Sequence, residues 1–285
     1  MSRPDTAPQT DPPKGKIALS GAACAAVGIA PPCFVRAGGV TRAETPHGPA
    51  WIKTVEPPRR NINGMILPVI ALLTPTPILR QSTTGKGGDT LLQQAERIRA
   101  LREQGLPVAD ILYSDRDFLI TADCGQTIEK PVRYAERREQ PGLDEAALGS
   151  ILLEMTRTLA AMHRQGTAHG RPKMRDFTWR DGTVTILDLE ERPWEVMSMA
   201  EAQARDVFLW VHDLCSAPLS RSIAPQAAAI LSDTMTPETR ESLRRFLRLL
   251  RRVSGPARLM LRILSGNREL TSGIAAHDVL SEIVG

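Results

Sequence analysis

The segment AHGRPKMRDFTW, residues 168–179, concentrates side chains that could take part in phosphoryl transfer. It contains a histidine, His169, a cation, Arg171, and a carboxylate, Asp176. A second carboxylate, Asp188, follows the mostly apolar run TVTIL. Phosphoryl transfer depends on carboxylates or amides that bind Mg²⁺, on cations that bind phosphate, and on a group that orients the acceptor hydroxyl. We therefore expect a site for ATP and Mg²⁺ here, with Asp176, Arg171 and His169 as the catalytic candidates.

Asp176 and Asp188 are the expected magnesium ligands. The turn-forming pair Asp181-Gly182 lies between them, which predicts a hairpin with both carboxylates near one end. Carboxylate oxygens are ligands that Mg²⁺ prefers. The structural alternative is that Asp176 only caps a turn and Asp188 only ends a strand.

Four residues nearer the N-terminus are candidates for nucleotide binding. Lys53 lies in the apolar segment AWIKTV and could bind the phosphates, and Glu96 on the following helix could hold the lysine. Gly38 and Gly39 could offer backbone amides to phosphate, although the segment lacks the full G-x-G-x-x-G spacing. The alternatives are an edge-strand lysine in water and a glutamate on a solvated helix face.

The elements that must position these residues are rich in strands first and in helices later. Residues 33–38 and 50–55 predict two strands of a hairpin joined by a mobile, turn-rich connection at 39–49. Strands are also expected at 107–114 and 117–123. Apolar residues at helical spacing predict helices at 89–105, 144–166, 200–216, 224–234 and 237–254, with a short one at 64–73.

Composition restricts the class of protein. The chain has 285 residues and a net charge of +4, which fits anionic partners such as nucleotides. Only 4% of its residues are aromatic, which argues against stacking on single-stranded nucleic acid, and we expect no nucleic-acid partner. The four cysteines form no CxxC pair, which favours free thiols over zinc. We expect no membrane span. Residues 14–32 imitate a signal peptide only loosely, because their apolar run is rich in Ala and Gly and leads into a strand. A cytoplasmic protein is expected.

Taken in order, these segments resemble the protein-kinase-like fold, and within it the bacterial lipopolysaccharide-core and Kdo kinases. WIKTV is similar to the strand that carries the phosphate-binding lysine, HGRPKMRD to the catalytic loop, and LDLE to the metal-binding Asp-Phe-Gly element. ARDVFLWVHDL is similar to a later helix whose aspartate, here Asp206, steadies the catalytic loop. The resemblance covers about residues 33–215.

The resemblance implies a two-lobed α+β fold. After a disordered tail at 1–15, a small β-rich N-terminal lobe would cover 16–125 and a larger helical C-terminal lobe 126–285. It also implies a kinase-like phosphotransferase that moves the γ-phosphoryl group of ATP to a hydroxyl of a sugar, glycolipid or protein.

One residue departs from the family pattern. Arg171 occupies the position of the usual catalytic aspartate, and a guanidinium cannot accept a proton. Three interpretations stay open: another carboxylate orients the acceptor, Arg171 binds an anion, or catalysis has been lost. The alternatives to an enzyme are thus a pseudokinase that binds nucleotide without turnover, or an interaction protein that binds none. We expect Arg171 to face the cleft and bind an anion, against the alternative of an arginine paired with an acidic surface residue.

A basic amphipathic helix is expected near the C-terminus. In residues 240–253 leucines and a phenylalanine share one face and the arginines lie largely elsewhere. Such a helix packs on its domain or lies on anionic lipid. The second alternative would place the protein at the periphery of the inner membrane.

Overall fold

The computed structural model describes residues 12–55, 78, 88–132, 144–263 and 268–284, and it describes side chains in these ranges except at 88 and 252–269. It divides the chain into two compact units. Among the described residues, 12–55, 88–99 and 109–123 belong to the first unit, and 78, 100–108, 124–132, 144–263 and 268–284 belong to the second. Helices and small antiparallel sheets are mixed, which is consistent with the α+β class.

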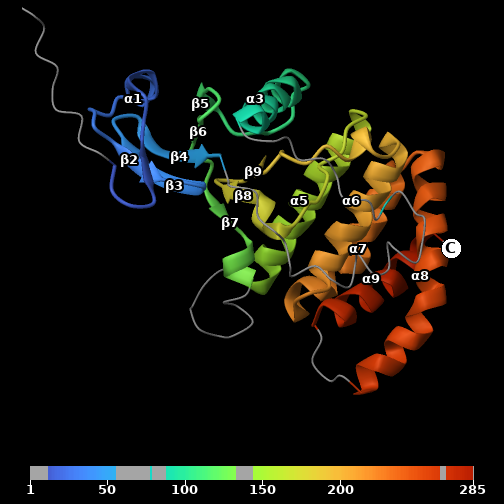
Figure 1. Cartoon of the computed structure of the whole chain (residues 1–285). Coiled ribbons are helices and arrows are strands. Elements are labelled where there is room, and N and C mark those ends of the chain that lie inside the picture. Colours follow the sequence, from blue (N-terminus) through green and yellow to red (C-terminus); the bar gives the residue numbers. More distant parts are fainter. Residues whose placement is uncertain (1–11, 56–77, 79–87, 133–143, 264–267, 285) are drawn as a thin grey trace, which may run out of the picture. The chain divides into compact units, whose positions relative to one another are not determined.

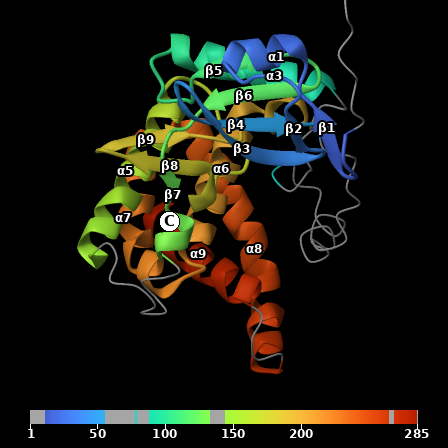
Figure 2. The same cartoon turned by 90° about the vertical axis from the view of Figure 1, so that its left-hand side faces the viewer.

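The first unit contains two small sheets. Strands β1 (Lys16–Ala18) and β2 (Phe34–Arg36) pair with each other. The second sheet has four strands in the order β3 (Gly39–Thr45), β4 (Gly48–Thr54), β6 (Phe118–Ala122) and β5 (Ile111–Ser114), all antiparallel (Figure 1). Helix α1 (Gly21–Val27) contacts β5, and Figure 2 shows it along this sheet. Helix α3 (Gly88–Glu103) contributes its first part to this unit.

Strand β4 has two different faces. Ala50, Ile52 and Thr54 are buried, and the first two belong to an apolar core that includes α1 residues. Trp51 and Lys53 lie on the other face and are half-buried. The period-two alternation of a strand thus separates Lys53 from the core.

The predicted hairpin was partly wrong. The connection at 39–49 is itself strand β3, which pairs with β4, whereas β2 pairs with β1. In β3 every second residue is half-buried, so the segment is a two-sided strand although it is rich in polar residues. The segment that resembles a signal peptide forms β1 and α1, and Ala23, Cys24 and Val27 of α1 are buried.

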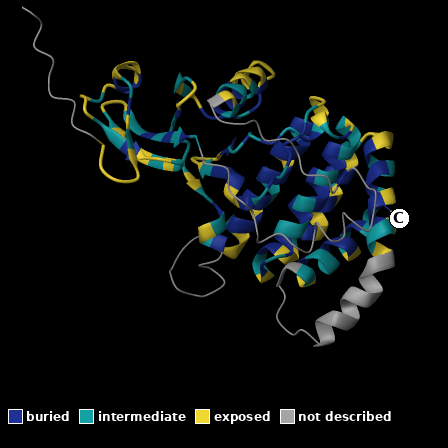
Figure 3. Ribbon diagram, in the orientation of Figure 1, coloured by how far each residue is buried: buried dark blue, intermediate teal, exposed yellow. Residues whose placement is uncertain are grey.

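The second unit is mostly helical. It contains α5 (Glu145–Arg164), α6 (Met199–Leu214), α7 (Pro218–Thr234), α8 (Pro237–Ile263) and α9 (Arg268–Val284). A three-stranded sheet has the order β7 (Gln126–Thr127), β8 (Phe177–Arg180) and β9 (Thr183–Ile186), and short 3-10 turns cover Met174–Asp176 and Pro193–Glu195. Dark blue segments on α5, α6 and α7 in Figure 3 mark the buried core of the helices.

Several predicted elements are confirmed. The helices at 89–105 and 144–166 correspond to α3 and α5, and each is followed by a glycine of positive φ, Gly105 and Gly166. The β8–β9 hairpin turns at Asp181 and Gly182, which both have positive φ. Helix α9 was not predicted.

Other predictions fall outside the described residues. Residues 64–73 do so completely, and the tail at 1–15 does so up to residue 11; residues 12–15 lead through a turn into β1. Among the helices of the described chain, none is long and apolar enough to cross a membrane.

Candidate functional site

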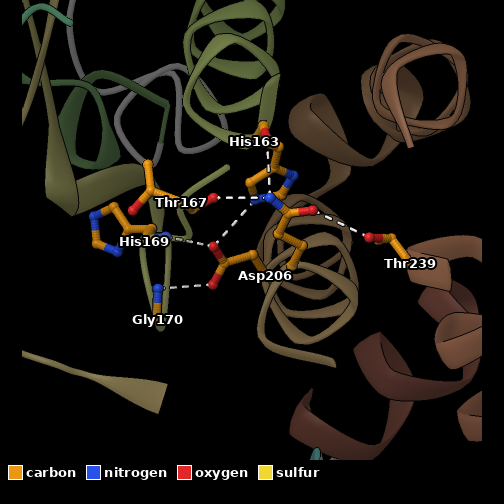
Figure 4. Close-up of polar contacts among 7 residues, drawn as sticks. His163, Thr167, His169, Gly170, Asp206 and Thr239 are labelled. Atoms are coloured by element: carbon orange, nitrogen blue, oxygen red, sulfur yellow. Dashed lines mark hydrogen bonds and ion pairs between the residues drawn. The ribbon is translucent and has the colours of Figure 1, made fainter. Parts of the chain in front are cut away.

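Asp206 on α6 holds the start of the 168–179 loop. Its carboxylate has no exposed surface and accepts backbone N–H groups from His169 (2.5 Å) and Gly170 (2.8 Å), one at each oxygen (Figure 4). His163 Nε2 lies 3.2 Å from the oxygen that accepts from His169. Hydrogen bonds to a charged carboxylate are stronger than neutral ones, so this clamp fixes the backbone on the N-terminal side of Arg171.

A chain of polar contacts continues from this clamp to α8. The Gln203 amide donates to the carbonyl oxygens of His163 (2.9 Å) and Thr167 (3.0 Å). Its own oxygen accepts from the Thr239 hydroxyl at 3.1 Å. Figure 4 shows this network between α5, α6 and α8. His163 is therefore a buried residue that belongs to this structural network.

A second aspartate of α6 holds the other end of the loop. The Asp213 carboxylate accepts the backbone N–H of Met174 at 2.7 Å. Burial raises the pKa of Asp213, and the Met174 hydrogen bond opposes that shift. Asp206 and Asp213 are two helical turns apart and share one face of α6, so this helix fixes the loop on both sides of Arg171, Pro172 and Lys173.

The backbone of Asp176 is tied to that of the segment containing Asp188. The Leu187 N–H donates to the Asp176 carbonyl (2.8 Å), and His169 Nε2 lies 3.0 Å from the Leu187 carbonyl oxygen. Asp188 has a φ of 51°, in the left-handed region that a non-glycine residue seldom adopts. Such backbone conformations concentrate at functional sites. The structure thus brings His169, Asp176 and Asp188 together, as the sequence predicted for one site.

The Asp176 carboxyl has an altered ionisation. Burial and then the negative charge of Asp188 raise its pKa from 3.8 to about 7, against the opposing charges of Arg175, Arg171 and Lys173. Asp176 is 4% exposed, and its carboxylate forms an ion pair with Arg175 Nε at 3.6 Å. Two carboxylates that repel each other in a largely buried place favour a bound cation.

The two aspartates fit Mg²⁺ by their chemistry. Both offer carboxylate oxygens, and Mg²⁺ commonly takes one or two protein carboxylates and keeps water or phosphate oxygens for its other positions. Within the described part of the chain no group of three or more His, Cys, Asp or Glu residues could hold a metal.

Arg171 pairs with a glutamate that the sequence did not single out. Its Nε lies 2.8 Å from Glu191 Oε1, and Arg205 on α6 lies 3.2 Å from Glu191 Oε2. The Glu191 side chain is only 10% exposed, whereas Arg171 is 39% exposed. The observed partner of Arg171 is thus a nearly buried glutamate rather than an acidic residue on the surface.

Gly170 allows this pairing. Its φ is +110°, and a Cβ added there would lie 2.9 Å from the Glu191 Cβ and 3.2 Å from the Glu191 carbonyl oxygen. A side chain would collide with the Glu191 backbone and strain its own. Only glycine therefore lets the loop approach the segment that carries Glu191.

The predicted nucleotide-binding residues lie in the first unit. Gly39 is opposite Thr54 in the β3–β4 ladder, one residue from Lys53, and the Gly39 N–H donates to the Thr54 hydroxyl at 3.2 Å. Gly38 precedes it with a φ of 69°. The structure thus brings the glycine bend and the Lys53 strand together. Glu96 is exposed on α3, and its pairing with Lys53 stays a prediction.

Three residues of the site were missed from the sequence. Asp213 could have been found, because it lies seven residues after Asp206 on a predicted helix. Arg205 and Glu191 gave no such signal, since their contacts join segments whose relative placement depends on tertiary packing.

Comparison with known proteins gives little guidance. No family model matches the chain. A stretch of 121 residues is 29% identical to part of an uncharacterized protein of Haemophilus influenzae. The matched stretch covers 40% of this chain and 45% of that protein. The chain thus matches less than half the length of this relative.

Proposed function

We propose that this chain is an ATP- and Mg²⁺-dependent phosphotransferase of the kinase-like type. The observation that carries the proposal is the Asp176–Asp188 pair, in which one carboxylate perturbs the other at the end of a loop fixed by Asp206. Perturbed carboxylates beside a rigid loop are the usual mark of a metal or catalytic site.

Each residue has a role in this proposal. Asp176 and Asp188 would hold Mg²⁺, which when bound neutralises phosphate charge. Lys53, Gly38 and Gly39 stay the candidates for binding nucleotide phosphates, with Glu96 as the expected partner of Lys53. His169 supports the carbonyl of Leu187 and so positions Asp188.

The acceptor hydroxyl would belong to a sugar, glycolipid or protein. The basic face of α8 keeps an anionic membrane as an alternative partner, although two of its arginines, Arg245 and Arg248, already pair with Glu241. A cytoplasmic location, with or without such membrane contact, is part of the same proposal.

A pseudokinase is the second candidate, and Arg171 favours it. A guanidinium cannot serve as a general base, whose loss costs about 10²–10⁴-fold in rate. An enzyme of this kind would depend on positioning and charge neutralisation, which carry most of the catalysis of phosphoryl transfer.

The test is Mg²⁺-dependent nucleotide binding followed by turnover. Wild-type protein is titrated with Mg·ATP by thermal shift, and ADP release is measured with and without Asp188→Asn. Binding together with ADP release that Asp188→Asn abolishes supports the phosphotransferase. Binding without any ADP release supports the pseudokinase, and no binding contradicts both. Exposed Asp233→Asn on α7 is the matched control.

A further inference from the structure

Arg171 is one of two arginines that pair with the same nearly buried glutamate, Glu191. Glu191 is 8% exposed and already has a more buried cation, Arg205, at its Oε2. Arg171 adds a second guanidinium at Oε1. Because Arg205 already pairs with the Glu191 carboxylate, charge pairing alone gives weak reason for the second arginine.

The backbone under Arg171 is fixed on both sides. Gly170 N–H binds Asp206 at 2.8 Å, and Met174 N–H binds Asp213 at 2.7 Å. Pro172 follows directly, and a residue before proline has a restricted backbone. Arg171 therefore loses little conformational freedom on binding a ligand, which favours affinity.

The contact with Glu191 leaves the guanidinium of Arg171 able to bind an anion. The contact with Glu191 is made by Nε, and a guanidinium also carries N–H groups on its terminal nitrogens. Those nitrogens form the planar fork that matches phosphate oxygens. The side chain is 39% exposed, so a solute can reach it.

The position of Arg171 relates it to the carboxylate pair. The carbonyl oxygen of Asp176 accepts the Leu187 N–H at 2.8 Å, directly before Asp188. Arg171 belongs to the same loop as Asp176, five residues earlier. An anion bound by Arg171 would thus lie beside the cation that Asp176 and Asp188 attract.

We propose that Arg171 is a phosphate-binding residue, aimed by Glu191, that contacts a phosphate group at the Asp176–Asp188 site. This inference rests on the proposed function and gives the arginine a role in place of the missing base. The phosphate is either the γ-phosphate of ATP or a phosphate carried by the acceptor, and the experiment distinguishes these two sources.

The experiment compares three ligands on the full chain. Mg·ATP, Mg·ADP and inorganic phosphate with Mg²⁺ are titrated against wild type, Arg171→Gln and Glu191→Gln. Arg157→Gln is the matched control, because Arg157 forms an exposed ion pair with Glu154 at 3.0 Å on α5. Arg171→Lys keeps the charge without the fork, and it serves if Arg171→Gln fails to fold.

A γ-phosphate contact predicts that Arg171→Gln weakens Mg·ATP binding by about tenfold or more and changes Mg·ADP binding little. An acceptor phosphate predicts that only inorganic phosphate binding is lost. Glu191→Gln should weaken the binding of the same ligand as Arg171→Gln does, by a smaller factor. Damage to the fold would instead weaken the binding of all three ligands alike. Arg157→Gln should change none of them.

Two results separate this inference from the proposed function. If wild type binds Mg·ATP and Arg171→Gln binds all three ligands as wild type does, the phosphate role is overturned while the function stands. If wild type binds phosphate through Arg171 but no nucleotide, the phosphate site stands and the function falls. Wild type that binds none of the three overturns both.

Discussion

Two buried aspartates of the second unit have opposite surroundings. Asp206 has backbone N–H donors at both carboxylate oxygens and a histidine beside one of them. Asp176 is almost as buried but faces the negative charge of Asp188, and its pKa rises to about 7. One carboxylate is satisfied by the fold and holds it together. The other has an ion pair with Arg175 at 3.6 Å but also the repulsion of Asp188, and a carboxyl perturbed in this way is expected at a ligand-binding site.

The strongest test of this contrast is the removal of the satisfied carboxylate. Asp206→Ala leaves the His169 and Gly170 N–H groups without their acceptor, and we expect the free energy of unfolding to fall by about 3–5 kcal/mol. Urea unfolding measures the change, with exposed Asp233→Ala as the control. Equal stability of the two variants would show that the clamp is dispensable.

Asp176→Asn should increase the free energy of unfolding above about pH 7, which is opposite to the effect of Asp206→Ala. The folded state raises the pKa of Asp176 from 3.8 to about 7, so it binds more protons than the unfolded state in this interval. Wild-type stability is therefore lost as pH rises from about 4 to 7, by at most about 4 kcal/mol.

The neutral amide avoids this loss. Asp176→Asn should exceed wild type in urea unfolding at pH 8 and match it near pH 4, while it loses Mg²⁺-dependent ATP binding. A variant whose stability follows pH as wild type does would place the cause of the pH dependence elsewhere.

The sequence predicts where the aspartates of this comparison lie along the chain and in its elements, but not the surroundings of each carboxylate. Asp176 and Asp188 were expected as a pair because the Asp181-Gly182 turn folds β8 onto β9, and that hairpin is confirmed. Helical periodicity likewise predicted α3 and α5.

The rest depended on packing between distant segments. Strand β3 was missed because its residues alternate between half-buried and exposed, so no apolar face marks the strand. The turn-forming residues around it obscure this weak pattern further. The partner of Arg171 lies twenty residues away, beyond any helical or strand period. Glu96 is exposed, which is the alternative that the sequence left open for it.

Asp213→Ala sharpens the comparison at the other end of the loop. Its carboxylate accepts one backbone donor, Met174 N–H, and burial opposes its charge. The expected loss is about 1–2 kcal/mol, less than for Asp206. Hydrogen exchange of the Met174 amide should become faster, while the amides of His169 and Gly170 keep their protection. Unchanged exchange at Met174 would argue against this brace.

The smallest effect is expected at the far end of the clamp's network. Thr239→Val removes the hydroxyl that donates to Gln203 and should cost about 1 kcal/mol, seen as a small decrease in Tm. Mg·ATP binding should not change. A larger loss than that of Asp213→Ala would mean that the network matters more than the direct contacts with the loop.

Helix α6 sets the spacing of the contacts that hold the loop beside it. Its start is fixed by a capping box in which Ser198 and Glu201 bind each other's backbone N–H groups. From this start, Gln203 contacts the end of α5, Arg205 contacts Glu191, and Asp206 and Asp213 hold the two ends of the loop. One residue inserted between Asp206 and Asp213 would turn the second by about 100° around the axis. The length of this stretch is thus constrained far more tightly than the identity of its other residues, and distant relatives should preserve the interval even where similarity of sequence has been lost.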